Sequence, residues 1–348
     1  MWQYFAPSLR SITIAGVVVD DGNLNDLRTR CGKLTCFMLE DCGKKITPDA
    51  LLSFISQYTS LAHIVLNIDD PLISDALIVH LSERPGLRTL GMRKHIPTAV
   101  LETAAAGVTA PFAKLESLEL TLSCSDVPLL TSWAGNITSL SLFVVGSEGD
   151  VLPHISSLRR LRSLKLGFLY PRVLSRAEIM TLRHLVNLVE LYIPSRGSSL
   201  DIADEEFSHR DFDDLFSRLS HLRRLYFGVF YTMTIDTLDS LSTHCPELEE
   251  LEIPVDVDKV ELEKRPGVMF PNLRLVEFSA IVWFDNKRIG QDEYDKRELV
   301  LLLKRHMPKL EELALGTVRL GEEALNSDAY NIDEDGTPVS VGGAQPAS

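Results

Sequence analysis

Few residues of this chain combine the types and the spacing that chemistry requires. Residues 331–336, "NIDEDG", begin like a calcium-binding loop, because oxygen-bearing side chains alternate before a glycine. The twelfth position of such a loop needs a bidentate glutamate, but here it is Gly342, and no predicted helices flank the segment. The sequence also lacks GxSxG, P-loop and HExxH motifs, and no GxGxxG follows a strand. We therefore predict no catalytic residues, metal or other cofactor, and expect that the protein is not an enzyme.

Cysteines and histidines show no grouping typical of a metal site or a disulfide framework. The five cysteines are an odd number without CxxC spacing, which argues against a zinc site and against paired disulfides. A reducing compartment fits best, so we expect an intracellular protein of the cytoplasm or nucleus. The nine histidines occur singly, and four fall within or at the ends of predicted helices, where a solvated or cap-bonded side chain is expected: His80, His184, His244 and His306.

A different set of residues has the spacing of a binding surface. Short segments such as "LESLEL", "LRSLKL", "LEELEI" and "LEELAL" follow the pattern apolar-x-x-apolar-x-apolar. Read as strands, they send the fourth and sixth residues inward and the third, fifth and seventh outward. From the seventh copy onward, the outward positions hold charged residues and tyrosines. We predict that these form a protein-binding face: Lys165, Glu190, Tyr192, Arg224, Tyr226, Glu250, Glu252, Glu277 and Glu312.

Two features make this face a candidate for binding. Tyr192 and Tyr226 occupy the fifth position of adjacent copies, so they should lie side by side, and exposed tyrosine beside arginine is typical of interface hot spots. The glutamates farther along form an acidic strip that suits a basic segment of a protein partner. The alternative is that these are ordinary solvated residues on a polar sheet face.

The strand pattern recurs through the chain and defines the elements that position this face. It occurs twelve times, and nine of the eleven steps between copies are 22 to 28 residues long, the range of leucine-rich repeats. Leucine accounts for 55 of the 348 residues. The copies begin at Leu9, Leu34, Leu61, Leu87, Leu115, Ile137, Leu161, Leu188, Leu222, Leu248, Leu273 and Leu310.

Between the copies the apolar residues take helical spacing. In "TPDALLSFISQY", Thr47 is a predicted N-cap and Pro48 the first helical residue. We predict further helices in "PLISDALIVHL", "SRAEIMTLRHL", "TIDTLDSLSTHC" and "DEYDKRELVLLLKRHM". One strand and one helix per turn bury their apolar faces only by stacking on neighbouring turns.

The fold class is therefore α/β, a leucine-rich-repeat solenoid of about twelve irregular repeats. We expect a curved horseshoe with a parallel sheet on its concave face and helices on its convex face. The solenoid should span residues 1–325, with insertions at 194–214 and 283–297 that are either recognition loops or solvated excursions. Residues 326–348 have four acids and no base, and are predicted to be a disordered acidic tail.

The charge distribution argues against some partners. Residues 1–174 contain 16 basic and 16 acidic residues, whereas residues 175–348 contain 19 and 33, so the second half carries the whole net charge of −14. Such a surface repels phosphate backbones and anionic lipid, so we expect neither nucleic acid nor membrane as a partner. No stretch approaches the length of an apolar membrane-spanning helix.

The repeat length of about 26 residues, the helical convex segments and the phrase "HCPELEEL" resemble the intracellular repeats of F-box proteins and their ribonuclease-inhibitor-like relatives. The phrase "FAPSLRSITI" is similar to the degenerate repeats of fungal F-box-like proteins. The resemblance implies the substrate-binding part of a ubiquitin-ligase receptor, in which an F-box binds a Skp-type adaptor. No stretch here matches an F-box, so the adaptor is an expected partner only if an F-box lies upstream of Met1.

Two other functions remain open at the level of sequence. The chain could be a stand-alone leucine-rich-repeat scaffold or inhibitor that binds one protein without any ligase. An enzyme, or a regulator of one, fits least, because no acid–base or nucleophile set is visible. The first strand begins nine residues into the chain without a polar capping unit, as if the chain began in mid-array. We expect an upstream domain or another chain to cover that edge, or an incomplete gene model at the start.

Overall fold

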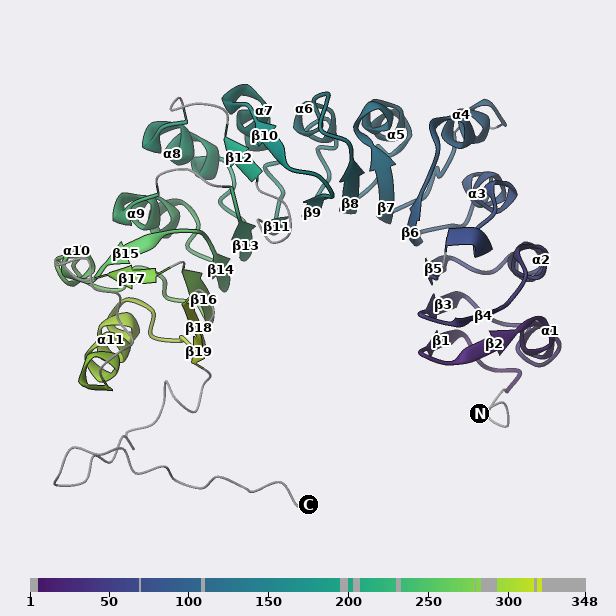
Figure 1. Cartoon of the computed structure of the whole chain (residues 1–348), viewed down its shortest axis with the longest axis horizontal. Coiled ribbons are helices and arrows are strands. Elements are labelled where there is room, and N and C mark those ends of the chain that lie inside the picture. The colour runs from purple at the N-terminus through teal and green to yellow at the C-terminus, as the bar shows by residue number, and fades with distance from the viewer. Residues whose placement is uncertain are drawn as a thin grey trace, which may run out of the picture.

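The computed structural model describes residues 6–68, 70–107, 110–194, 200–202, 207–229, 233–278, 280–282, 293–315 and 318–320. The described chain forms an arch, with one layer of strands on its inner side and one layer of helices on its outer side (Figure 1). Every one of the twelve predicted copies forms a strand, and the twelve strands pair in chain order into one parallel sheet. The expected leucine-rich-repeat solenoid is confirmed.

Each strand pairs with the equivalent residues of the next copy, and the register shifts only at the end of β6, between Gly91 and His95 in its pairing with β7, among the described strands. A last strand, β19 (Val318–Leu320), pairs antiparallel with β18. The parallel strands are β1 (Ser11–Ala15), β3 (Cys36–Glu40), β5 (His63–Asn67), β6 (Thr89–His95), β7 (Ser117–Ser123), β8 (Ser139–Val145), β9 (Ser163–Phe168), β11 (Glu190–Ile193), β13 (Arg224–Phe227), β14 (Glu250–Glu252), β16 (Leu275–Phe278) and β18 (Glu312–Leu315).

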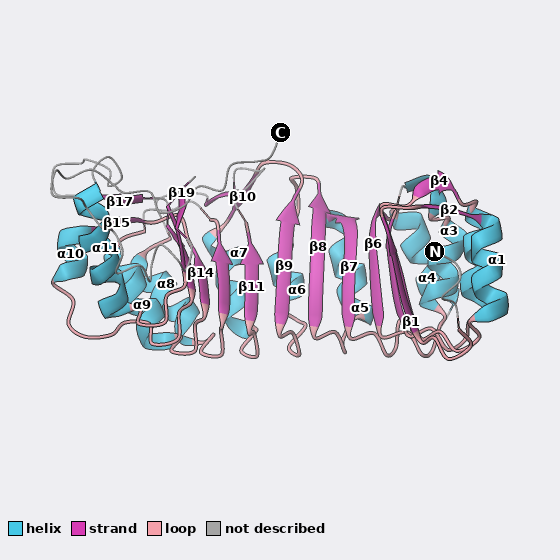
Figure 2. Ribbon diagram, turned by 90° about the horizontal axis from the view of Figure 1, so that it is seen from below, coloured by secondary structure: helices cyan, strands magenta, loops and turns pink. Residues whose placement is uncertain are grey.

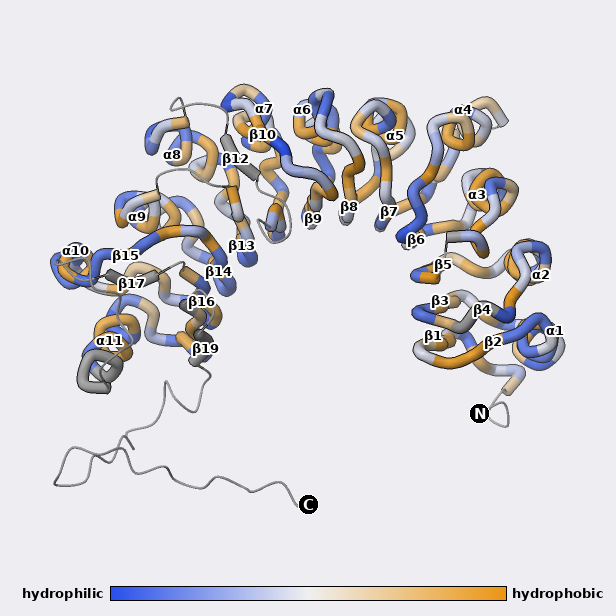
Figure 3. Tube along the Cα trace, in the orientation of Figure 1, coloured by the Kyte–Doolittle hydropathy of each residue, from blue (hydrophilic) through white to orange (hydrophobic). Residues whose placement is uncertain are grey.

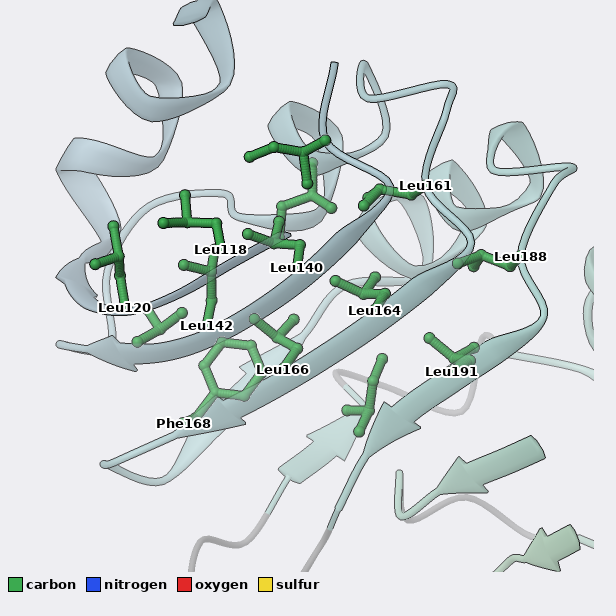
Figure 4. Close-up of a cluster of buried hydrophobic side chains, with 14 of the residues drawn as sticks. Leu118, Leu120, Leu140, Leu142, Leu161, Leu164, Leu166, Phe168, Leu188 and Leu191 are labelled. Carbon is green, nitrogen blue, oxygen red and sulfur yellow. The ribbon is translucent and has the colours of Figure 1, made fainter. Parts of the chain in front are cut away.

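The core lies between the strand and helix layers. Leu140, Leu164 and Leu191 are register partners in consecutive strands, and none of the three has any exposed surface. Figure 4 shows such leucines side by side, from Leu118 to Leu191. A fully buried leucine stabilises a fold by about 1.5–3 kcal/mol, so repeating this position along the arch builds a continuous core. Hydrophobic and hydrophilic residues alternate within each repeat and do not collect in one segment (Figure 3).

Helices of unequal length form the convex layer. They are α1 (Asp21–Arg30), α2 (Pro48–Gln57), α3 (Asp75–Ser82), α4 (Thr98–Gly107), α5 (Val127–Trp133), α6 (Leu152–Ile155), α7 (Arg176–Met180), α8 (His209–Ser217), α9 (Ile235–His244), α10 (Lys259–Glu263) and α11 (Glu293–His306). Short 3-10 helices cover Asp70–Leu72, Cys124–Asp126 and Thr181–His184.

The predicted helices form, with two differences in their extent. Thr47 caps α2 as expected, since its hydroxyl accepts a hydrogen bond from the Ala50 amide. The segment 175–185 is a five-residue α-helix followed by a 3-10 helix, not one continuous helix. Helix α8 begins inside the predicted insertion 194–214, where Ser208 and Asp211 form a capping box. Helix α11 likewise begins inside the predicted insertion 283–297.

Three short parallel ladders lie along the edge where the main strands end (Figure 2). They pair β2 (Val18–Asp20) with β4 (Gly43–Lys45), β10 (Arg172–Leu174) with β12 (Leu200–Ile202), and β15 (Asp256–Asp258) with β17 (Ala280–Val282). The sequence pattern did not predict them. Each joins two consecutive turns of the solenoid and so adds to the contact between neighbouring repeats.

Several sequence predictions lie outside the described residues. They are the tail at 326–348 with its calcium-like segment and most of the insertion 283–297. Within the part of the chain that the structure describes, no helix has the length and apolar character needed to cross a bilayer.

Candidate protein-binding face

The predicted binding residues lie on the inner side of the arch, in strands β9 to β18 (Figure 1). We call the outward-facing side chains of the main sheet on this side the concave face. One row of it contains the fifth residue of every copy, because these residues are register partners from strand to strand. The row reads Thr13, Met38, Val65, Gly91, Glu119, Ser141, Lys165, Tyr192, Tyr226, Glu252, Glu277 and Ala314.

Tyr192 and Tyr226 are neighbours in this row, as their spacing predicted. Their ring centroids are 5.1 Å apart and the ring planes are inclined by 52°. Tyr226 is fixed further, because its hydroxyl donates a hydrogen bond to the Glu250 carboxylate. Burial raises the pKa of Tyr226 well above its usual value, and the bond to Glu250 raises it further. The pair is therefore a preformed aromatic surface, in which the Tyr226 hydroxyl is held by Glu250.

Glu190 is not the open contact residue that the alternation predicted. Only 9% of this residue is exposed. Its carboxylate accepts a hydrogen bond of 2.7 Å from the Ser163 hydroxyl and pairs with Lys165 Nζ at 3.2 Å and Arg224 Nη2 at 3.5 Å. Burial alone would raise the Glu190 pKa, but the Ser163 hydrogen bond and the two cations outweigh burial and lower it. Glu190 thus positions Lys165 and Arg224, whose side chains stay about half exposed.

The glutamates beyond the tyrosines lie in two rows. Tyr226, Glu252 and Glu277 are consecutive register partners, and Ala314 follows them. In the neighbouring row Glu250 is separated from Glu312 by Leu275. All four glutamates are partly exposed. The predicted acidic strip is therefore continuous from Glu250 through Glu252 to Glu277, and Glu312 lies beyond it.

The N-terminal half of the concave face has a different character. Its fifth-position row contains Met38, Val65 and Gly91 and no charge until Glu119. A Cβ atom at position 91 would lie 3.2 Å from the Val65 side chain, so glycine at this position avoids a close contact with Val65. Farther along, Phe143 lies over Gly167, where an added Cβ would be 2.9 Å from the ring. The tyrosine pair and the consecutive charged positions of the row thus lie in the strands from β9 onward, whereas Glu119 is the single charge of the row before them.

The described residues offer no alternative chemical centre. No group of three or more His, Cys, Asp or Glu among them could hold a metal ion, and all five cysteines are free thiols. Cys42 is buried, with its Sγ donating to the Ile14 carbonyl at 3.3 Å, so this thiol bonds one turn to the next. His306 differs from the solvated side chain expected of the helical histidines, because it is fully buried.

Comparison with known proteins supports the fold. No protein-family model and no curated protein matches the chain. Among solved structures, 124 chains match, one of them from the crystal structure of the Rad7 and Elc1 complex in yeast. That chain superposes with a TM-score of 0.55 at 15% identity, and the match covers 90% of this chain and 78% of the other. Identity this low shows a shared fold and leaves function to the residues.

Proposed function

We propose that this protein is a non-catalytic protein-recognition module that binds its partner on the concave face between β9 and β18. The observation that carries this proposal is the contact between the rings of Tyr192 and Tyr226, a pair that leads directly into the row of Glu252 and Glu277. Rigid tyrosines lose little side-chain entropy on binding, and adjacent carboxylates attract a segment with lysine or arginine.

A finer role follows from the resemblance to F-box proteins. In that role the module is the substrate-binding part of an F-box-type ubiquitin-ligase receptor. The resemblance in repeat length and the solved complex of a solenoid of similar fold with a second protein support it. A stand-alone scaffold or inhibitor with the same binding face is the alternative, and the adaptor contact distinguishes the two.

The binding face is tested with a pool of fluorescein-labelled nine-residue peptides that carry lysine or arginine at alternate positions. Fluorescence anisotropy should show binding to the wild type, and the double variant Tyr192→Ala/Tyr226→Ala should raise Kd about tenfold or more. Tyr170→Ala is the matched control, because Tyr170 is 54% exposed but lies after β9, outside the concave face.

A second pair of variants tests the charge. Glu252→Gln/Glu277→Gln should weaken binding of the same pool and reduce its dependence on salt. Glu102→Gln/Glu148→Gln removes two charges from exposed positions outside the strands and should change little. Equal binding by the wild type and both concave-face variants, with folding intact by circular dichroism, would refute the proposed face.

The ligase role needs a separate measurement. The product of the full native transcript is expressed with a Skp-type adaptor, and co-elution in size-exclusion chromatography is scored. Co-elution supports the receptor role, whereas separate elution of a folded product that still binds the peptide pool supports the stand-alone module.

A further inference from the structure

A second candidate binding surface lies outside the concave face, at one end of the same strands. It is a groove of about 720 Å³. Its lining residues lie at the edge of the sheet where the main strands begin, and Figure 2 shows these strands from end to end. Its lining residues come from the turns that precede strands β8 to β14: Thr138, Arg160, Arg162, Asn187, Val189, His221, Arg223 and Glu247. These three arginines and one glutamate give the lining a net charge of +2, in a chain whose net charge is −14.

The positive charge of the groove depends on which of its arginines have an acidic neighbour. We call the residue directly before each main strand the pre-strand residue, and backbone hydrogen bonds join these residues from one turn to the next. Two pre-strand arginines outside the groove, Arg88 and Arg274, have an acidic neighbour in the following turn, whereas Arg10 at the first strand is followed by Thr35. Arg88 pairs with Glu116, and Arg274 pairs with Glu311 at 2.7 Å.

Arg162 has no acidic neighbour of this kind. Its pre-strand neighbours are Thr138 and Val189, neither of which carries a charge. The side chain of Arg162 is exposed, and it has no ion pair among the described residues. Arg160 beside it bonds the neutral Asn136, at 3.0 Å, and has no ion pair within the part of the chain that the structure describes. The end of the groove at β9 therefore holds two guanidinium groups without an acidic partner.

At the other end of the groove, the charges of arginine and glutamate side chains offset each other. Arg223 bonds Glu247 through two nitrogens, at 2.9 and 3.1 Å, and lies 3.7 Å from Glu249. The groove thus attracts an anion near Arg160 and Arg162 and disfavours a second anion near Glu247.

We propose that this groove binds a phosphorylated serine or threonine within an extended peptide, with the phosphoryl group at Arg160 and Arg162. A phosphoryl group carries a charge of about −1.5 to −2 at neutral pH, which matches the net charge of the lining, whereas one carboxylate would leave an uncompensated cation. Guanidinium forks also match phosphoryl oxygens in geometry.

The length of the groove favours a peptide over a free phosphate or a long polyanion. The lining crosses four strand spacings, about 19 Å, which accommodates about six residues of extended chain and far exceeds a free phosphate. The side chains of Asn187 and Thr138 donate to the carbonyls of Arg159 and Glu116, so their oxygens can accept bonds from peptide amides, and Val189 offers an apolar contact. A long polyanion such as nucleic acid would continue onto the acidic strands beyond β13 and be repelled.

The test measures fluorescence anisotropy with three fluorescein-labelled pools of nine-residue peptides that are random apart from the centre. The centre is phosphoserine, serine or two glutamates. The phosphoserine pool should bind at least tenfold more tightly than the serine pool, and Arg162→Gln should remove most of that difference. Arg88→Gln is the matched control, because Arg88 is a pre-strand arginine outside the groove, and this variant should bind as the wild type does.

Several results would overturn the proposal. Equal binding of the phosphoserine and serine pools, or an equal effect of Arg162→Gln and Arg88→Gln, would exclude the site. Equal binding of the glutamate pool would replace phosphoserine by a carboxylate cluster. Displacement of the phosphoserine pool by an equimolar amount of inorganic phosphate would show that a free anion occupies the groove. The Tyr192→Ala/Tyr226→Ala variant should retain phosphopeptide binding, so failure of the concave face and failure of the groove are distinguishable.

Discussion

His306 ends helix α11 with its imidazole inside the protein. None of its surface is exposed, its ring lies against the backbone of Gly267 and Leu262, and its carbonyl accepts bonds from the Met269 and Phe270 amides. Burial lowers the pKa of His306, and the positive charge of Arg305 lowers it further. The folded protein therefore holds this side chain neutral at a pH where the unfolded chain already begins to bind a proton.

This difference predicts acid sensitivity. Because the pKa of His306 is lower in the folded state than in the unfolded state, the unfolded chain binds more protons below about pH 6.5, so the free energy of unfolding falls there. One such group contributes a slope of at most about 1.4 kcal/mol per pH unit. Urea unfolding of His306→Met between pH 7 and pH 5 should show a smaller slope than the wild type.

A neighbouring variant separates titration from packing. Met307 is equally buried and does not titrate, so Met307→Leu should shift the free energy of unfolding by a similar amount at every pH. A slope for His306→Met equal to that of the wild type and of Met307→Leu would show that His306 does not cause the acid sensitivity.

Residue environments were the least predictable from sequence. Alternation predicted that Glu190 faces the concave side, but not that its carboxylate is buried. Its partners Ser163 and Arg224 are 27 and 34 residues away, so its environment depends on the register of three strands. The Tyr192 and Tyr226 pairing was predictable, because a constant repeat places equal positions side by side.

At the scale of one element, Thr47 connects two helices as well as capping one. Its hydroxyl accepts from the Ala50 amide at 3.2 Å and donates to Asp21 at 2.9 Å, and its own amide donates to Asp21 at 2.7 Å. Thr47→Ala should lower the free energy of unfolding by about 1–2 kcal/mol, because it removes the cap and one bond to α1. Thermal or urea unfolding measures this loss.

Two further variants define the cause. Thr47→Ser keeps the hydroxyl and should retain most of the stability. Thr103→Ala removes an exposed hydroxyl that bonds back to the Ala99 carbonyl within α4, and should stay within about 0.5 kcal/mol of the wild type. A loss for Thr103→Ala as large as that for Thr47→Ala would argue against a specific cap.

Elements with a long periodic pattern were predictable, and short ones were not. The twelve strands and helix α2 each contain several apolar positions at a fixed spacing. The ladder of β10 and β12 has three residues per strand, too few to show any period. Helix α8 starts within a stretch whose polar composition indicated a loop, yet Phe212 and Phe216 are fully buried there.

At the scale of the whole molecule, the repeat makes one surface predictable and hides another. The concave face follows from strand alternation alone. The basic groove does not, because Arg162 differs from Arg88 and Arg274 only through the residues of the adjacent turns. Its charge becomes visible once backbone hydrogen bonds place Thr138 and Val189 on either side of it.

The lengths of the strand ladders also predict where the solenoid opens first. The ladder of β7 with β8 has seven residue pairs and that of β8 with β9 has six, whereas β14 has three with β13 and three with β16. The stability of a solenoid is approximately a sum of terms for single repeats and for contacts between neighbours. Fewer pairs therefore mean a lower free energy of local opening around β14.

Hydrogen exchange followed by mass spectrometry tests this gradient. Leu140 in β8 and Leu251 in β14 hold the same repeat position and are both fully buried, so peptides that contain them compare ladder length at equal burial. Amides of β14 should exchange at least about tenfold faster than those of β8, since each lost backbone bond removes roughly 0.5–1.5 kcal/mol. Equal protection at both positions would mean that the arch opens as one cooperative unit. A sum of terms for single repeats and their neighbour contacts would then not describe the stability of the solenoid.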